Sequence, residues 1–289
     1  MPGMPRIGIG LPNFGPEAGP EAILRIASTV ERLGFHGVSV CDRLLLPLGE
    51  EWENTYGLPD SYIFDPVETL TFVAARTGRI RLATTIVNSP FQSPIVLARR
   101  LATLDQLSGG RLDAGIGLGW MPEEYAASGV PYAERGARFE DHLAAMRACL
   151  GPDPVQHDGP FYQVPKAKIG PKPVNGRLCV LVGGVAKPAI ERAARLGDGF
   201  IAAIREWETT LQEIAWYRAA GGTGMVMLRT ASSWDAQAED PIGMSVAAMM
   251  ADLTTFAEAG VDEVHWDLTL AGIGIDRQIE VLEALAMHV

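Results

Sequence analysis

Short runs of apolar residues alternate along the chain with longer segments whose apolar positions recur every three or four residues. The first run covers residues 6–11 (RIGIGL) and is typical of a buried strand, and the amphipathic segment after it covers residues 21–33. Gly34 follows directly, where glycine commonly ends a helix. The pattern predicts this strand-then-helix unit eight times, which indicates a parallel sheet covered by helices.

The predicted elements follow one another in strict alternation. Strands are expected at residues 6–11, 37–40, 80–87, 112–118, 178–182, 199–204, 225–230 and 263–268. Helices are expected near residues 21–33, from Asp65-Pro66, from Pro94, near 134–150, 187–196, 206–219 and 245–259, and from Asp276. One stretch, residues 151–177, contains six prolines and is predicted to be irregular.

Eight such units predict an α/β fold, a closed (β/α)8 TIM barrel formed by one domain over residues 1–289. An open doubly wound sheet is the alternative. Its dinucleotide fingerprint is missing, because the segment GIGLGW has Trp120 where the third glycine of GxGxxG belongs. The barrel is therefore favoured.

Composition narrows the possible functions. The net charge of -11 argues against a nucleic-acid binder or an acidic-membrane binder, because both need a basic surface. The three cysteines form no CxxC pair, and no Cys/His cluster has metal-ligand spacing, so we expect reduced thiols and no metal. No apolar run has the length of a signal peptide or a membrane span, which predicts a cytoplasmic protein.

In a barrel of this kind the active site lies where strands end and helices begin. This rule selects candidates without reference to any family: Asn13, Asp42, Arg43, Asn88, Gly119, Trp120, Glu124, Gly183, Gly184, Arg205, Arg229, His265 and Asp267.

Several candidates also have a purely structural interpretation. Asp42 and Arg43 could form an ion pair at the strand end, and Asn13 could cap the turn next to it. His265 is better interpreted as a hydrogen-bonded histidine inside the barrel, and Trp120 could simply plug the barrel mouth.

Two glycine pairs are expected to differ in role. Gly183-Gly184 lies between a buried strand and a helix start, where exposed backbone N–H groups suit a phosphate, although a tight turn is the alternative. Gly109-Gly110 precedes a strand on the far face, where we expect a stabilising turn with Arg111 held in ion pairs.

Four segments together resemble one family, the luciferase-like monooxygenase superfamily, and within it the branch of coenzyme F420-dependent oxidoreductases. They are GFHGVSVCDR (34–43), RIRLATTIVNSPFQSPIVLARRLATLDQLSGGRLDAGIGLGWMPEEYAASGVP (79–131), HDGPFYQVP (157–165) and VLVGGVAKPAIERAARLGDGFI (180–201). The resemblance spans the barrel from its first strand to at least its sixth.

The resemblance implies a layout for a flavin-type cofactor. A non-proline cis peptide at Thr85-Ile86 would form a bulge behind the cofactor ring, with Asp42 beside it. The GLGW loop, including Gly119 and Trp120, and the Gly183-Gly184-Val185 turn would hold the ribityl chain and the phosphate. Family members are commonly dimers, so a homodimer is expected.

The chain also departs from its relatives. Many carry His where this chain has Arg43, and sugar-phosphate dehydrogenase relatives carry Glu at the position of Asn13. Hydride transfer between F420 and a small organic substrate is the predicted reaction, with Asp42, Arg43 and Asn13 as catalytic candidates. The alternatives are an FMN-dependent monooxygenase supplied by a partner flavin reductase, and a non-catalytic flavin-binding barrel.

Overall fold

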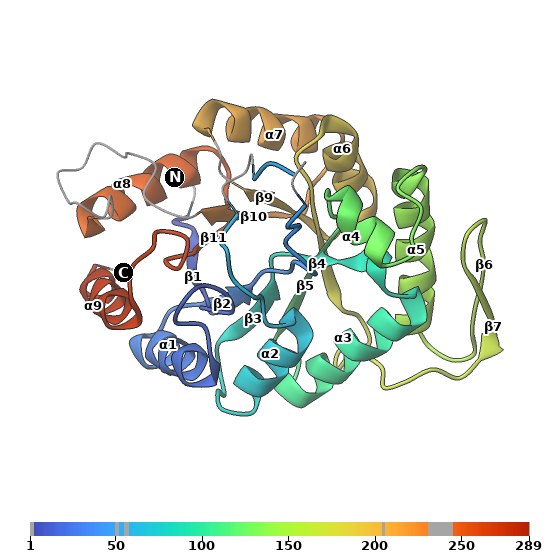
Figure 1. Cartoon of the computed structure of the whole chain (residues 1–289), viewed down its shortest axis with the longest axis horizontal. Helices are drawn as coiled ribbons and strands as arrows, with labels where there is room; N and C mark the ends of the chain where they lie inside the picture. The colour runs from blue at the N-terminus through green and yellow to red at the C-terminus, as the bar shows by residue number, and fades with distance from the viewer. Residues whose placement is uncertain (1–2, 50–51, 55–57, 204–205, 231–244, 289) are drawn as a thin grey trace.

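Parallel strands close on themselves to form a barrel (Figure 1). The structure is a computed structural model that describes residues 3–49, 52–54, 58–203, 206–230 and 245–288. Neighbouring strands follow the order β3-β2-β1-β11-β10-β9-β8-β5, and β5 pairs again with β3 to complete the ring. The predicted (β/α)8 barrel is therefore confirmed.

The strands of the barrel have these bounds: β1 (Arg6–Gly10), β2 (Gly37–Val40), β3 (Arg81–Thr84), β4 (Val87–Asn88), β5 (Leu112–Gly117), β8 (Cys179–Gly183), β9 (Gly199–Ala203), β10 (Met225–Thr230) and β11 (Glu263–Trp266). The outer helices are α1 (Pro20–Leu33), α2 (Pro66–Ala74), α3 (Pro94–Ser108), α5 (Arg135–Leu150), α6 (Lys187–Leu196), α7 (Trp207–Ala219), α8 (Val246–Glu258) and α9 (Ile275–Ala286).

The strand predicted at residues 80–87 is interrupted. Its two parts, β3 and β4, both pair with β5, and the five steps from Leu82 to Val87 lie opposite the four steps from Leu112 to Ile116. One extra residue is therefore accommodated at Thr85-Ile86, as in a β-bulge. Strand β4 leads into a short 3-10 helix, η1 (Ser89–Phe91).

The interior of the barrel is packed with side chains below the strand ends. Ala83, Leu181, Ile201 and Met227 form a small buried cluster there. Further down, His265 fills the space beside Gly8, because a Cβ on Gly8 would lie 2.2 Å from its ring. His265 Nε2 contacts Glu263 Oε1 at 2.6 Å, so the interpretation of His265 as a barrel-interior histidine is confirmed.

Arg111 stabilises the far end of the barrel, but not through ion pairs as predicted. Its guanidinium donates hydrogen bonds to the carbonyl oxygens of Ala74, Thr77 and Ile80 and to the Thr77 hydroxyl. Backbone carbonyls that converge at helix and strand ends satisfy a planar guanidinium as well as carboxylates do. These acceptors all belong to residues 74–80, the stretch between α2 and β3 that the fold brings to Arg111.

The stretch 151–177 is more regular than predicted. It contains an antiparallel hairpin of β6 (Val155–Asp158) and β7 (Gln163–Ala167), which stands apart from the barrel beside α5 (Figure 1). Each strand buries one valine, Val155 in β6 and Val164 in β7, whereas the prolines lie at the turn and flanks of the hairpin or at an exposed position in β7. The prediction missed the hairpin because prolines dominate its local composition.

Asp141 of α5 fastens this hairpin to the barrel. Its Oδ2 accepts hydrogen bonds from the N–H groups of Phe161 and Tyr162 at 2.8 Å, and its Oδ1 lies 2.7 Å from His157 Nε2. Burial alone would raise the pKa of Asp141, but these hydrogen bonds outweigh it and hold the pKa below its usual range.

No described helix combines the length and the apolar character that crossing a membrane requires.

We predict that Asp141→Asn loosens the hairpin by about 1–3 kcal/mol, because its N–H donors lose a charged acceptor. A carboxyl whose pKa is lower in the folded protein than in the unfolded chain stabilises the fold above its unfolded pKa, which lies near 4. This contribution is lost as the pH falls through the pKa of the folded state. Hydrogen exchange of residues 155–167 should therefore show a large difference from wild type at pH 7 that shrinks below about pH 4. The exposed neighbour Asp158→Asn is the control, and an equal effect from it would contradict the assignment.

Candidate active site at the barrel mouth

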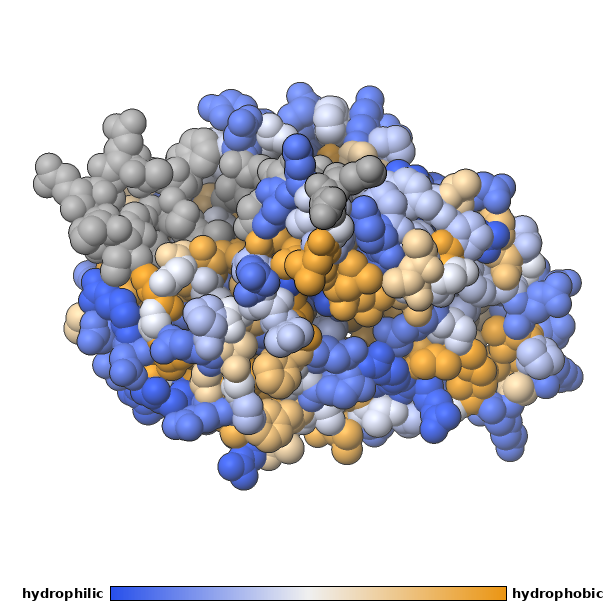
Figure 2. Space-filling model, in the orientation of Figure 1, coloured by the Kyte–Doolittle hydropathy of each residue, from blue (hydrophilic) through white to orange (hydrophobic). Residues whose placement is uncertain are grey.

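A cavity of about 570 Å³ lies where the strands of the barrel end. Its lining comes from the ends of β4, β5, β8, β9 and β10 and from the segments that follow β2 and β5. Most of the lining is apolar, and Figure 2 shows apolar surface gathered near the centre of the face that Figure 1 presents. Cavities of this size and character are typical of small-molecule sites.

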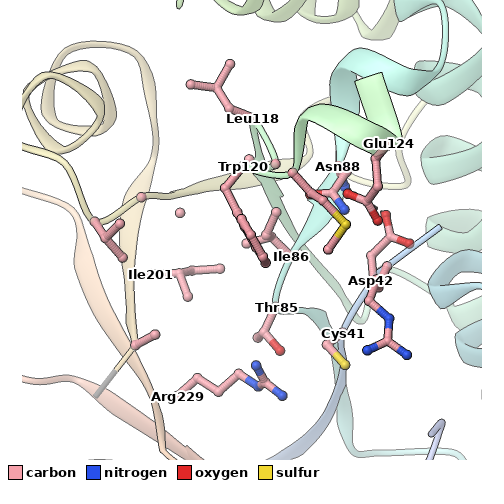
Figure 3. A pocket seen from close by; sticks show the side chains of 18 of the residues that line it. Cys41, Asp42, Thr85, Ile86, Asn88, Leu118, Trp120, Glu124, Ile201 and Arg229 are labelled. Carbon is pink, nitrogen blue, oxygen red and sulfur yellow. Dashed lines mark hydrogen bonds between the residues drawn. The ribbon is translucent and has the colours of Figure 1, made fainter. Parts of the chain in front are cut away.

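Ile86 stands in the middle of the cavity wall, at the interruption between β3 and β4 (Figure 3). The Thr85-Ile86 peptide is cis, as predicted. A Cβ on Gly117 would lie 2.5 Å from Ile86 Cδ1, and a Cβ on Gly183 would lie 2.7 Å from Ile86 Cγ2. Glycine at these positions of β5 and β8 therefore leaves room for the Ile86 side chain.

Two carboxylates lie on one side of the cavity, Asp42 after β2 and Glu124 in the short helix α4 (Pro122–Ala127), which was not predicted (Figure 3). Asp42 Oδ2 accepts a hydrogen bond from Asn88 N at 2.9 Å, and Glu124 Oε1 accepts one from Leu44 N at 2.6 Å. Burial raises the pKa of Asp42 to about 6 and also raises the pKa of Glu124. With a pKa of about 6, Asp42 can hold or release a proton near neutral pH.

Arg43 does not pair with Asp42, so the ion pair considered from the sequence does not form. Its guanidinium donates instead to the carbonyl oxygens of Pro59, at 3.1 Å, and Ser61, at 2.5 Å. Leu58, Pro59 and Ile63 line the cavity, as Arg43 does. Arg43 therefore holds one wall segment of the cavity in place.

Asn13 lies behind the cavity and is fully buried, and the residues that line the cavity do not include it. Its Nδ2 donates hydrogen bonds to the carbonyl oxygens of Cys41, at 2.9 Å, and Phe64, at 3.1 Å. Asn13 therefore links the segment after β2 to the segment around Phe64, and both segments contribute residues to the cavity lining.

The turn after β8 presents backbone donors to the cavity. Gly184, Val185 and Ala186 line it just before α6, and no described residue accepts a hydrogen bond from their N–H groups or caps the helix with a side chain. A Cβ on Gly184 would lie 2.7 Å from the Cβ of Ala189, so the turn is also tight. The two interpretations made from the sequence, a tight turn and an anion site, are compatible here.

Gly119 and Trp120 form the loop between β5 and α4. Gly119 has φ of 70°, the left-handed region that favours glycine, and a Cβ there would lie 3.1 Å from Asn88 Oδ1. This turn brings Trp120 to the cavity, where Figure 3 shows its side chain above Ile86, although the residue is 45% exposed.

Two arginines also line the cavity, one selected from the sequence and one not. Arg229 lies at its floor and forms an ion pair with Asp267, whereas Arg135 stacks 4.0 Å from the Tyr132 ring at its rim. Arg229 was indicated by its place at a strand end. Arg135 follows no strand, so only the folded chain reveals it. Arg205 lies outside the described residues.

We predict that Gly117→Ala destabilises the protein by about 1–3 kcal/mol, because its methyl group collides with Ile86 Cδ1. Ile86→Val removes that atom and should restore most of the lost stability in the double variant. Gly183→Ala collides with Cγ2 instead, which valine retains, so Ile86→Val should not rescue it. Denaturant unfolding of these variants measures both effects, and equal rescue of both glycine variants would contradict the packing described.

We also predict that Asp42→Asn removes a pH-dependent cost to folding. A carboxyl whose folded pKa is raised to about 6 contributes stability below its unfolded pKa, near 4, and loses it as pH rises through 6. Asp42→Asn should therefore be more stable than wild type at pH 7, and the two should converge near pH 4. Urea unfolding between pH 4 and 8 tests this, with the exposed Asp60→Asn as control. A difference that does not vary with pH would contradict the raised pKa.

Comparisons with known proteins place the chain in a family. The family model for luciferase-like monooxygenases matches residues 6–261. The uncharacterised protein Rv0953c of Mycobacterium tuberculosis is 32% identical over 270 residues, which cover 88% of this chain and 89% of that protein. The F420-dependent glucose-6-phosphate dehydrogenase of Kribbella flavida is 31% identical over 202 residues, which cover 68% of this chain and 57% of the dehydrogenase.

Solved structures share the fold at low sequence identity. Monooxygenase RslO1 from Streptomyces bottropensis superimposes with a TM-score of 0.81 at 23% identity, with 98% of each chain covered. The FMN-bound oxygenating constituent of 3,6-diketocamphane monooxygenase from Pseudomonas putida gives a TM-score of 0.75 at 15% identity, with 99% of this chain and 98% of that chain covered. The match over nearly the whole barrel shows that this chain belongs to the luciferase-like monooxygenase family.

Proposed function

We propose that this chain is an oxidoreductase that binds coenzyme F420 at the barrel mouth and exchanges hydride with a small organic substrate. The observation that carries this proposal is that one cavity is lined both by an apolar wall and by a turn whose N–H groups have no acceptor among the described residues. Ile86 forms the wall, and the N–H groups of Gly184, Val185 and Ala186 form the turn. The F420-dependent relative supports F420, and the FMN-bound structural neighbour supports an FMN-dependent monooxygenase as the alternative.

The described residues fit a flavin-type cofactor. A ring needs an apolar surface to lie against, which Ile86 supplies between β5 and β8. A phosphate needs backbone donors at a helix start, and the turn before α6 has three in the cavity lining. Gly119 and Trp120 also line the cavity and would contact the ribityl chain that joins the ring of the cofactor to its phosphate.

A bound, reduced cofactor of this type would supply hydride or, in the case of FMN, react with O₂. The protein's own residues would exclude water and handle the proton. Asp42 would handle this proton, because it lines the cavity and its pKa of about 6 allows both protonation states near neutral pH. Arg43 and Asn13 would act by holding the cavity walls. The homodimer and the flavin reductase stay predictions.

We predict that each phosphorylated cofactor binds more tightly than its dephosphorylated ribityl form, because the turn before α6 recognises the phosphate. Val185→Asp places a negative charge on this turn and should remove most of that preference. Val96→Asp, an exposed valine of α3 outside this cavity, is the matched control. Fluorescence titration with F420, FMN and the two dephosphorylated forms measures the affinities.

The same titration tests the whole proposal. Binding of FMN without binding of F420 would overturn the F420 assignment in favour of the monooxygenase. Failure of the wild-type protein to bind either cofactor would overturn the proposed function itself. Tight binding with no reoxidation of the reduced cofactor by any acceptor would instead indicate a binding protein.

A further inference from the structure

Arg229 places a guanidinium at the floor of an otherwise mostly apolar cavity. It lies near the end of β10, and Figure 3 shows its side chain directed from the strand toward Thr85 and Cys41. Its Nη2 donates a hydrogen bond to Asp267 Oδ2, and no other described residue accepts a hydrogen bond from it. Because a guanidinium has five N–H donors, most of them are left for a molecule in the cavity.

Asp267 is itself held firmly behind Arg229. It is 3% exposed, its backbone N–H donates to Thr230 O at 2.7 Å, and its Oδ1 accepts from Leu270 N at 3.3 Å. It packs so closely on β1 that a Cβ on Gly10 would lie 2.9 Å from its Cα. A carboxylate fixed in this way orients the guanidinium before any ligand arrives.

Stability does not account for this ion pair. A buried Arg–Asp pair must overcome the loss of hydration of both charges, and apolar residues of similar volume are often as stabilising. Arg229 also lines the cavity with its side chain 21% exposed, and its other N–H groups have no acceptor among the described residues. Recognition of a ligand does account for both features.

The charge balance indicates what kind of oxygen is recognised. Asp267 already neutralises Arg229, so a second full carboxylate is not needed to satisfy its charge. Asp42 and Glu124 on another side of the cavity would oppose an anion when ionised. A carbonyl or enolate oxygen accepts the spare N–H groups without this conflict.

We propose that Arg229 binds the carbonyl or enolate oxygen of a molecule in the cavity and that Asp267 is the residue that positions it. This deepens the proposed function, on which it rests, because it names the substrate class as a small, mostly apolar carbonyl compound or its alcohol. The oxygen could instead belong to a carbonyl group of the cofactor ring. The experiment below separates these two sources.

The test uses Arg229→Met, Arg229→Lys and Asp267→Asn in the full chain. Arg147→Met is the matched control, because Arg147 also pairs with an aspartate, Asp198, at 3.2 Å but does not line the cavity. Infrared difference spectra report the ring carbonyl bands of bound F420 or FMN. Cyclohexanone with a ¹³C-labelled carbonyl is the second probe, and its affinity and carbonyl stretch are measured with and without cofactor.

If the oxygen is the substrate's, Arg229→Met should weaken cyclohexanone binding roughly ten- to a hundredfold and return its carbonyl stretch toward the value in water. Arg229→Lys should recover part of the affinity, and the affinity of Asp267→Asn should lie between those of wild type and Arg229→Met. The ring carbonyl bands of the cofactor should not move. If the oxygen is the cofactor's, the ring bands should shift and cofactor affinity should fall, with cyclohexanone unaffected.

The proposal is overturned if Arg229→Met and Arg147→Met leave both probes equally unchanged while wild type binds a cofactor. Absence of cofactor binding by wild type would contradict the proposed function instead. Cyclohexanone binding to the cofactor-free protein would then still decide the role of Arg229.

Discussion

The side chain of Ile86 occupies space that two glycines on neighbouring strands leave free, and this contact sets where the cavity wall lies. Gly117 of β5 admits its Cδ1, and Gly183 of β8 admits its Cγ2. The extra residue between β3 and β4 brings Ile86 into that position. Because protein interiors are closely packed, a larger residue at either glycine would displace this wall.

Burial gives the polar groups around this wall their chemical properties. It raises the pKa of Asp42 to about 6, because the charged form loses hydration that backbone hydrogen bonds from Asn88 and Arg43 replace only in part. Arg229 stays charged in the same cavity, because Asp267 lies against it. A carboxyl with a raised pKa and a charged guanidinium thus line one mostly apolar cavity.

Much of the fold could be predicted from the chain because barrel elements have strong local signals. Apolar runs and amphipathic periods located the strands and the outer helices, and Asp65 caps α2 through its side chain as predicted. The β6–β7 hairpin was missed, since prolines obscured its strand pattern, and the short helix α4 was missed as well. Arg111 was assigned the right location and the wrong partners, because the carbonyls that it binds lie 31 to 37 residues earlier in the chain.

The sequence by itself determined the barrel, the end at which the site lies, and the cis peptide at Thr85-Ile86 through a family resemblance. Only the tertiary structure decided the tasks of individual side chains there. It placed Asn13 and Arg43 in supporting contacts, Gly183 against Ile86, and Arg229 at the floor with Asp267. The physical reason is that strand order and helix period are local properties, whereas a hydrogen-bond partner or a pKa depends on neighbours that the folded chain brings from distant positions.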